Sequence, residues 1–420
     1  MVKVYYKCLF TQLAPLRIGT GSGEKTDHDL VKDSRGVPVI PGTSIAGVLR
    51  CLLSDSDATE VFGDVTTGED PKSIPSKVLV SDAVLPLNLK EADYRISQRD
   101  GVGLSDNGTA SSHAKYLFEV VECDQPYTAI LELADDADSS RIVPLLEGAL
   151  RQAQAVGLSF GARSTRGYGR VSVSVTKRTF SFPAQLDEWL CFDPLKDCIS
   201  DPLPAGAVTE NNRSIRIDLT LEMCDSFSVR VYTTAIVPTE EEAVPVQIAL
   251  ENKTGDAVIP GTSLAGCFRH HMRQLARGCG LGEPVCQQID LLFGIADNEK
   301  KRSAISFSEA AVDTKKLITM TRNAIDRFTN ATRNQWLFTT SVARGGKASV
   351  TILLPENTAS VLCRLLAASI NDLNQGLLTL GGEAGVGRGL CRVTQLTVNG
   401  AEKTSEMQAL RTDYLLGGEG

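Results

Sequence analysis

Two short segments combine a proline, a glycine and two hydroxyl side chains where a helix is predicted to begin. Both read PGTS, at 41–44 and 260–263, and apolar residues at helical spacing follow each. The first N–H groups of a helix lack partners within it and carry partial positive charge, so together with hydroxyl donors they suit a phosphate. Simple capping of the helix is the alternative. The residues predicted to contact phosphate are Thr43, Ser44, Thr262 and Ser263.

Two segments rich in glycine and arginine offer a second kind of phosphate contact. They include RGYGRV at 166–171 and RGLCRV at 388–393. Glycine lets the main chain approach a phosphate closely, and arginine supplies charge and planar donors. Two ordinary turns with solvated arginines are the alternative. The arginines predicted to bind are Arg163, Arg166, Arg170, Arg388 and Arg392.

Cationic and aromatic side chains alternate in the longer segments 94–117 and 322–344. Such interleaving is typical of surfaces that bind single-stranded nucleic acid by stacking and charge. Tyr116, Phe328 and Trp336 are the aromatic members, although Trp336 fits a protein core equally well. The cationic members are Arg95, Arg99, Lys115, Arg322, Arg327, Arg333 and Arg344.

The elements that position these residues occur twice. VPVIPGTSIAGVLR at 37–50 returns as DAVIPGTSLAGCFR at 256–269, with nine of fourteen positions identical. Further blocks repeat in the same order: 61–64 with 292–295, 80–84 with 307–311, 115–120 with 335–340, and 166–171 with 388–393. The segment 194–213 is rich in turn-forming residues and lacks helical or strand periodicity. We therefore predict two domains, at about 1–205 and 212–420.

Each half has the element order of an α+β, ferredoxin-like or RRM-like module. Alternating apolar residues predict opening strands at 2–10 and 214–223, and the longer periodicity predicts helices at 141–156 and 358–374. A glycine-rich segment and a closing strand follow each helix. Residues 85–117 and 312–337 do not fit a minimal module, and loops of that length are usually functional or disordered.

Composition restricts the setting of the protein. The 420 residues carry a net charge of −8, which argues weakly against a lone nucleic-acid binder but allows a basic face on an acidic body. No apolar run is long enough for a membrane span, so a cytoplasmic protein without a membrane partner is expected. Eleven cysteines, an odd number without a CxxC pair, are expected to be reduced.

The combination of a PGTSLAG-type turn, an LFG-type segment and a terminal RGYGRV-type loop resembles the RAMP superfamily of CRISPR-associated proteins. Within it, NAIDRFTNATRNQWLF at 323–338 is similar to the β-hairpin thumb of the Cas-seven backbone subunits of type III complexes. The resemblance covers most of the chain. It implies two tandem RAMP domains, each with an inserted β-hairpin thumb and a glycine-rich loop.

The resemblance also implies a function. Such subunits line up along a CRISPR guide RNA and grip its backbone, while the thumb passes between guide and complementary target RNA and displaces a base pair. Expected partners are both RNAs and other effector subunits: other RAMP subunits, a small subunit and a large polymerase-like subunit. Arg50 and Arg269, which close the two copies of the repeated block, complete the predicted RNA-binding set.

Subunits of this kind cleave target RNA with an acidic residue in the loop ahead of the PG turn. Matching that pattern to 19–42 places Asp27 at the catalytic and metal-binding position, with Asp29 as second choice. A carboxylate there would hold Mg²⁺ or another divalent cation beside the scissile phosphate. In the second half Pro245 falls where the acid would lie, and Glu240, Glu241 and Glu242 lie nearby. Cleavage is therefore assigned mainly to domain one.

Three alternatives stay open. A guide-processing, metal-free endoribonuclease would need a histidine, for which His28 and His113 are candidates. A scaffold that binds guide RNA without catalysis is the second alternative. The third is a structural zinc on residues whose spacing matches no common ligand pattern, namely His270, His271, Cys279 and Cys286.

Overall fold

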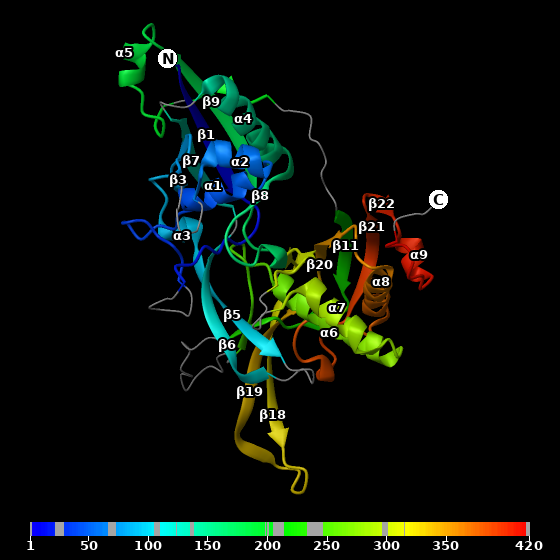
Figure 1. The fold of residues 1–420 in the computed structure, drawn as a ribbon. Coiled ribbons are helices and arrows are strands. Elements are labelled where there is room, and N and C mark those ends of the chain that lie inside the picture. Colours follow the sequence, from blue (N-terminus) through cyan, green and yellow to red (C-terminus); the bar gives the residue numbers. More distant parts are fainter. Residues whose placement is uncertain are drawn as a thin grey trace. The chain divides into compact units, whose positions relative to one another are not determined.

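The protein is described by a computed structural model, drawn in Figure 1. The described residues are 2–21, 29–65, 73–104, 110–122, 124–134, 138–197, 199, 201–204, 214–232, 247–295, 301–314 and 316–416. The chain forms two compact units. The first consists of Met1–Arg99, Tyr116–Ser164 and Tyr168–Asn211, and the second of Asp100–Lys115, Thr165–Gly167 and Asn212–Gly420. The predicted boundary between 205 and 212 lies outside the described residues.

The first unit is built on an antiparallel sheet with β1 (Val2–Gln12) at its centre. β1 pairs with β9 (Arg170–Ser181) on one side and β7 (Pro126–Leu133) on the other, and β4 (Val78–Val80) pairs with β7. The short strands β8 (Leu158–Ser159) and β10 (Asp201–Pro202) pair with β9. Its helices are α1 (Gly42–Arg50), α2 (Asp55–Phe62), α3 (Glu91–Tyr94), α4 (Ser139–Val156) and α5 (Leu186–Leu190).

The second unit repeats this sheet. β11 (Ser214–Met223) lies between β21 (Cys391–Val398) and β20 (Lys347–Pro355), β16 (Ser306–Phe307) pairs with β20, and β22 (Ala401–Glu402) pairs with β21. Its helices are α6 (Gly261–Gly278), α7 (Gly282–Phe293), α8 (Ser360–Gln375) and α9 (Thr404–Gln408). The four main strands in chain order are β1, β4, β7 and β9 in the first unit and β11, β16, β20 and β21 in the second. In both units the first of these strands lies between the last and the third, and the second lies outside the third. This is the ferredoxin-like order, so the predicted fold class is confirmed.

Alternation of apolar residues explains why the sheets fold against the helices. Along β11 the buried positions are Ile215, Ile217, Leu219, Leu221 and Met223, and they share one core with residues of α6 and α8. The corresponding core of the first unit joins alternate residues of β1 to α1 and α4. Each fully buried aliphatic side chain stabilises the fold by roughly 1.5–3 kcal/mol.

Hairpins occupy the two segments that did not fit a minimal module. In the first half of the sequence these are β5 (Ile96–Leu104) and β6 (Ala110–Val121), and in the second half β18 (Leu317–Ile325) and β19 (Thr332–Arg344) (Figure 1). β19 also pairs with β12 (Ser226–Phe227) and β14 (Gln247–Ala249), and β14 pairs with β13 (Arg230–Tyr232). The remaining strands pair as β2 (Asp64–Val65) with β3 (Ser73–Ile74), and β15 (Val258–Ile259) with β17 (Ala310–Ala311).

Close packing explains the glycine of each PGTS segment. A Cβ at Gly42 would lie 2.3 Å from the carbonyl oxygen of Val80, and one at Gly261 would lie 2.5 Å from that of Phe307. The N-cap residues are Pro41 and Pro260, and neither helix has a side-chain cap. The expectation that threonine or serine caps these helices is therefore wrong, because both hydroxyl residues lie inside the first turn.

Gly42→Ala is expected to lower the free energy of unfolding by about 1–3 kcal/mol, the usual cost of overpacking. Gly47→Ala in the same helix is the matched control, because its Cβ would meet nothing within 4 Å. The control should be neutral or more stable by up to about 1 kcal/mol, since alanine favours helix over glycine. Urea denaturation measures both, and equal stabilities for the two variants would contradict the packing argument.

Within the described part of the chain, no helix combines the length and apolarity that crossing a membrane requires.

Candidate nucleic-acid interface

The N-terminus of α1 already has an anionic partner. The N–H of Gly42 donates to Oδ1 of Asp82 at 2.8 Å. Bridges Ile40–Ala83 and Ile259–Ala310 show that Glu309 holds the same place in the second unit as Asp82 holds in the first. The Thr43 side chain is exposed, and Ser44 is half-buried. A phosphate at this turn would therefore meet hydroxyls beside a carboxylate, and RNA contact here stays a prediction.

The repeated arginines at the ends of the PGTS blocks hold equivalent turns. Arg50 donates to the carbonyl oxygen of Gly63, and Arg269 Nη1 donates to that of Gly294 at 3.3 Å. Arg269 also pairs with Asp290 at 2.8 Å. These contacts explain why arginine and the later Phe-Gly dipeptide recur together. Both guanidinium groups have a structural role, and their predicted RNA contact is untested.

The loop that carries the catalytic candidates is anchored from β6. Asp27 lies outside the described residues, and Asp29 is half-buried with its carbonyl accepting from Thr20 N–H at 3.0 Å. The next N–H, of Leu30, donates to Oε2 of Glu119 at 3.2 Å, and Lys32 Nζ lies 3.1 Å from the same oxygen. Glu119 is buried. The carboxylate of Glu119, which sequence reasoning missed, therefore fixes the backbone immediately after Asp29.

The second unit lacks an acid at the position of Asp29. The N–H of Val31 donates to Ile18 O at 2.8 Å, and the N–H of Leu250 makes the same bond to Val229 O at 2.8 Å. This register aligns Asp29 with Ile248. Pro245 and the neighbouring glutamates Glu240, Glu241 and Glu242 lie outside the described residues.

The glycine-rich loops match in a different register from the one predicted. Phe160 N–H donates to Gly169 O at 2.9 Å, and Leu380 N–H donates to Gly389 O at 2.9 Å. Gly169 therefore aligns with Gly389, whereas the predicted pairing of 166–171 with 388–393 would align it with Cys391, two residues later. The cause is backbone conformation: glycines at positive φ recur at 161, 167 and 169 and at 381, 387 and 389, and these fix the loop whatever arginines flank them.

Arginines and aromatic rings form a cluster in the first unit. The guanidinium of Arg17 lies 4.5 Å from the ring centre of Phe118, and that of Arg163 lies 4.8 Å from the ring centres of both Tyr116 and Phe118. The two rings stack with centres 6.0 Å apart, and Arg163 also donates to the Tyr116 hydroxyl. The sequence pointed to Tyr116 and Arg163, but Arg17 and Phe118 were missed.

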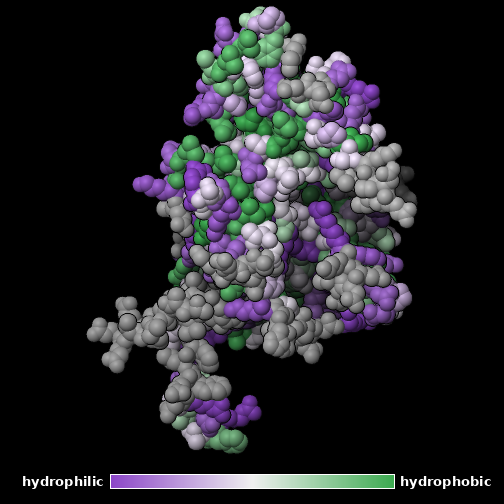
Figure 2. Space-filling view, turned by 60° about the vertical axis from the view of Figure 1, so that its left-hand side comes forward, coloured by the Kyte–Doolittle hydropathy of each residue, from purple (hydrophilic) through white to green (hydrophobic). Residues whose placement is uncertain are grey.

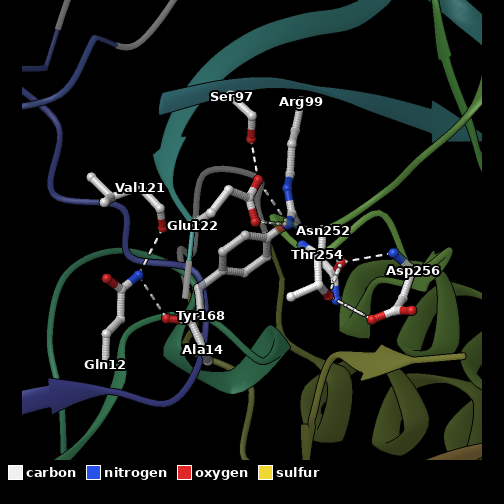
Figure 3. A network of polar contacts seen from close by, with 10 residues as sticks. All are labelled: Gln12, Ala14, Ser97, Arg99, Val121, Glu122, Tyr168, Asn252, Thr254 and Asp256. Carbon is white, nitrogen blue, oxygen red and sulfur yellow. Dashed lines mark hydrogen bonds and ion pairs between the residues drawn. The ribbon is translucent and has the colours of Figure 1, made fainter. Parts of the chain in front are cut away.

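Arg99 is buried in an adjoining network of the same unit (Figure 3). Its side chain is 2% exposed and its Nη2 lies 3.1 Å from Oε2 of Glu122, which is fully buried. Ser97 also donates to Glu122, and the Arg99 guanidinium lies 5.6 Å from the Tyr168 ring centre. Glu122 therefore neutralises the charge of Arg99 inside the protein, and its predicted RNA contact stays a prediction.

A turn of the second unit, also drawn in Figure 3, shows how closely the repeat holds in detail. Asn252 Oδ1 accepts from the N–H groups of Thr254 and Asp256 at 3.0 and 2.9 Å. In the first unit Asp33 Oδ1 accepts from Arg35 and Val37 at 2.8 and 3.0 Å.

Three predicted cations, Arg388, Arg322 and Arg166, are held by contacts within the second unit. Arg388 is buried and forms an ion pair with Glu383, and Arg322 Nη2 lies 3.6 Å from the same carboxylate. Arg388 also contacts Met320 Sδ at 3.4 Å. Arg166, which belongs to the second unit, donates to Phe293 O at 2.6 Å and Ser303 Oγ at 3.0 Å.

The remaining predicted cations are exposed. Arg327 and Arg333 flank the tip of the β18–β19 hairpin, where Phe328 is 94% exposed. Hydrophilic and hydrophobic residues lie side by side at this tip, at the bottom of Figure 2. Nothing is described of the Trp336 side chain. The other exposed members are Arg95, Lys115, Arg170, Arg344 and Arg392.

The residues considered for zinc lie in ordinary structural positions. Cys286 is fully buried in the apolar core, and His271 Nε2 lies 2.7 Å from Asp372 Oδ2. Among the residues that the structure describes, no group of three or more histidine, cysteine, aspartate or glutamate side chains could hold a metal ion.

Comparison with known families identifies the class of protein. The model of the RAMP superfamily matches residues 10–172 and 206–392, one match in each half. The chain therefore belongs to the RAMP superfamily. Membership suggests a CRISPR-associated RNA-binding subunit that associates with CRISPR RNA and other effector subunits, in a family that includes some endoribonucleases. The search of curated proteins found no match.

Proposed function

We propose that this protein is a backbone subunit of a type III CRISPR ribonucleoprotein, acting in the cytoplasm. Its two domains, at about 1–205 and 212–420, would bind guide RNA along the spacer. The observation that supports this proposal is the duplication itself: two ferredoxin-like sheets of identical strand order occur in one chain, with hairpins and glycine-rich loops in the same sequence order. A subunit that follows a regular RNA strand gains from presenting the same binding elements at regular intervals.

The tip of the β18–β19 hairpin has suitable chemistry for a thumb. Phe328 is almost fully exposed; Arg327 precedes it in the turn, and Arg333 lies near the start of β19 with its Nε 3.6 Å from Oδ2 of Asp326. Asp326 accepts from the N–H groups of Phe328 and Thr329, both at 3.0 Å, which holds the turn that presents the ring. An apolar ring between cations suits insertion beside a base pair, where stacking replaces hydration and the cations meet phosphates.

Cleavage of complementary target RNA is proposed for domain one. Asp27 is the first candidate and Asp29 the second. Domain one is favoured because the second unit carries Ile248 in place of Asp29. Their carboxylates are hard oxygen donors, and Mg²⁺ commonly binds to one or two carboxylates together with substrate phosphate and water. The chemistry of these donors therefore fits a divalent cation, which would neutralise charge that develops on the phosphate. The chain's own contribution is to hold the loop through Glu119.

A nuclease footprint on the reconstituted complex tests the proposal. Guide RNA assembled with the full chain and its partner subunits should show two protected segments per copy of this chain, one for each domain. A single protected segment would leave one domain without guide contact, and an unprotected spacer would refute the proposal. Dependence of target cleavage on Mg²⁺ further separates this function from a metal-free processing enzyme.

A further inference from the structure

Arg17 and Arg163 bring two positive charges together at one aromatic ring of the first unit. Arg17 is only 7% exposed, and both guanidinium groups lie against the ring of Phe118. Within the described residues, neither arginine has a carboxylate partner, and the Tyr116 hydroxyl is the hydrogen-bond acceptor of Arg163. Burial and the neighbouring Arg163 lower the pKa of Arg17. A buried cation is normally paired, so this arrangement calls for an anion.

The second unit provides a natural comparison for this site. Ala162 N–H donates to Arg17 O at 2.9 Å, and Gly382 N–H donates to Ser228 O at 2.8 Å, so Ser228 takes the place of Arg17. The next loop residues are Arg163 and Glu383, and both have left-handed backbone conformations, with φ of 64° and 63°.

The chemistry at this shared position is opposite in the two units. Glu383 is paired with Arg388 and Arg322, so the second unit neutralises its own loop with an internal carboxylate. In the first unit the same backbone position carries the cation Arg163. An external anion in the first unit would thus correspond to the built-in carboxylate of the second.

The ligand is expected to be a phosphate group and not a base. Tyr116 and Phe118 already stack on each other with Arg163 4.8 Å from both ring centres, so the guanidinium groups are the stronger ligand-binding feature of the cluster. Two guanidinium groups close together supply the planar donor pairs that suit phosphate oxygens.

We propose that Arg17 and Arg163 form a binding site for one phosphate of an RNA strand, present in the first unit and replaced in the second by Glu383. This inference rests on the proposed function and adds to it an asymmetry between the domains. Binding here would be independent of base sequence, because phosphate contacts carry no sequence information.

The first test is equilibrium binding of a single-stranded RNA oligonucleotide to the full chain over a range of KCl concentrations. Arg163→Glu and Arg17→Gln should each weaken binding roughly 10- to 100-fold, as expected for lost hydrogen bonds to a charged group. The salt slope should fall by about 0.7, the value for one phosphate on a single strand. Exposed Arg411, which is paired with Asp413, supplies the controls: Arg411→Gln matches the charge change of Arg17→Gln, and Arg411→Glu matches that of Arg163→Glu.

The second test uses sulfate as a probe in place of RNA. Sulfate should raise the melting temperature of the wild type and of Arg411→Glu more than that of Arg163→Glu, because an ion that binds only the folded state stabilises it. Arg163 is half-buried on a loop, so this variant carries the test if Arg17→Gln fails to fold.

The outcomes separate this site from the proposed function. Wild-type RNA affinity and salt slope in folded Arg163→Glu would overturn the site while leaving RNA binding intact. If the wild-type chain binds no RNA, the proposed function fails, and the sulfate measurement then decides the site alone. An equal sulfate effect in the wild type and Arg163→Glu would overturn it.

Discussion

Replacing Asp27 by alanine is expected to reduce cleavage of complementary RNA by the reconstituted complex about 10²- to 10⁴-fold, the range for a positioned catalytic group. The carboxylate lies in the loop whose backbone Glu119 anchors at Leu30. Cleavage should be measured with Mg²⁺ and with chelator, alongside guide and target binding, which are expected to be unchanged. Asp29→Ala and the double variant show which carboxylate acts.

Asp187→Ala is a suitable control because it removes one exposed carboxylate from α5, away from the candidate loop in sequence. It should leave the product pattern intact. An unchanged pattern in the Asp27 and Asp29 double variant would refute the catalytic assignment and leave a tandem RNA-binding scaffold. Cleavage that persists in chelator would instead favour metal-free chemistry.

Glu122→Ala is expected to lower the free energy of unfolding by about 3–5 kcal/mol, the usual cost of removing one partner of a buried ion pair. Arg99, which is only 2% exposed, would lose the Glu122 carboxylate, while the Tyr168 ring and hydroxyl that also contact it in Figure 3 would stay. Urea denaturation of the full chain measures the change, and the transition that reports the first unit should shift.

The matched control is Glu188→Ala, which breaks an exposed pair with Arg178. A surface pair contributes roughly 0–1 kcal/mol, so this variant should be nearly as stable as the wild type. The double variant Arg99→Met with Glu122→Leu should recover much of the lost stability, because it removes both charges. Equal stability of Glu122→Ala and Glu188→Ala would contradict the buried ion pair.

The sheets were predictable because their signals are local. Strand β11 occupies the predicted residues 214–223, since apolar residues alternate along its whole length. The helices predicted at 141–156 and 358–374 correspond to α4 and α8, with ends shifted by at most two residues. The order of these elements then fixes the ferredoxin-like module.

The candidate sites were less predictable because their contacts join distant residues. Glu119 meets Lys32 across 87 positions, and nothing in the pattern around either residue indicates the pair. Arg17 lies just beyond the first strand and was passed over because no motif surrounds it. The sequence predicted Arg99 as a cation of an RNA-binding surface, and the structure shows that its charge is neutralised by Glu122.

The glycine-rich loops show a different limit. Identical Arg-Gly dipeptides favoured pairing Arg166 with Arg388, whereas the hydrogen-bond register pairs Arg163 with Glu383. Side-chain identity is a weaker guide there than backbone conformation, since the glycines at positive φ determine the path of the loop. Counting matching glycines instead of matching arginines would have found the correct register.

The most direct test of the central claim, that this chain binds guide RNA through its backbone, is equilibrium binding of the full chain to two RNAs. One is the guide and the other an unrelated sequence of equal length, both titrated over a range of KCl concentrations. The account predicts affinities for the two within a few-fold of each other and a linear fall of log K with log salt. Absence of binding, or an affinity that does not change with salt, would contradict it.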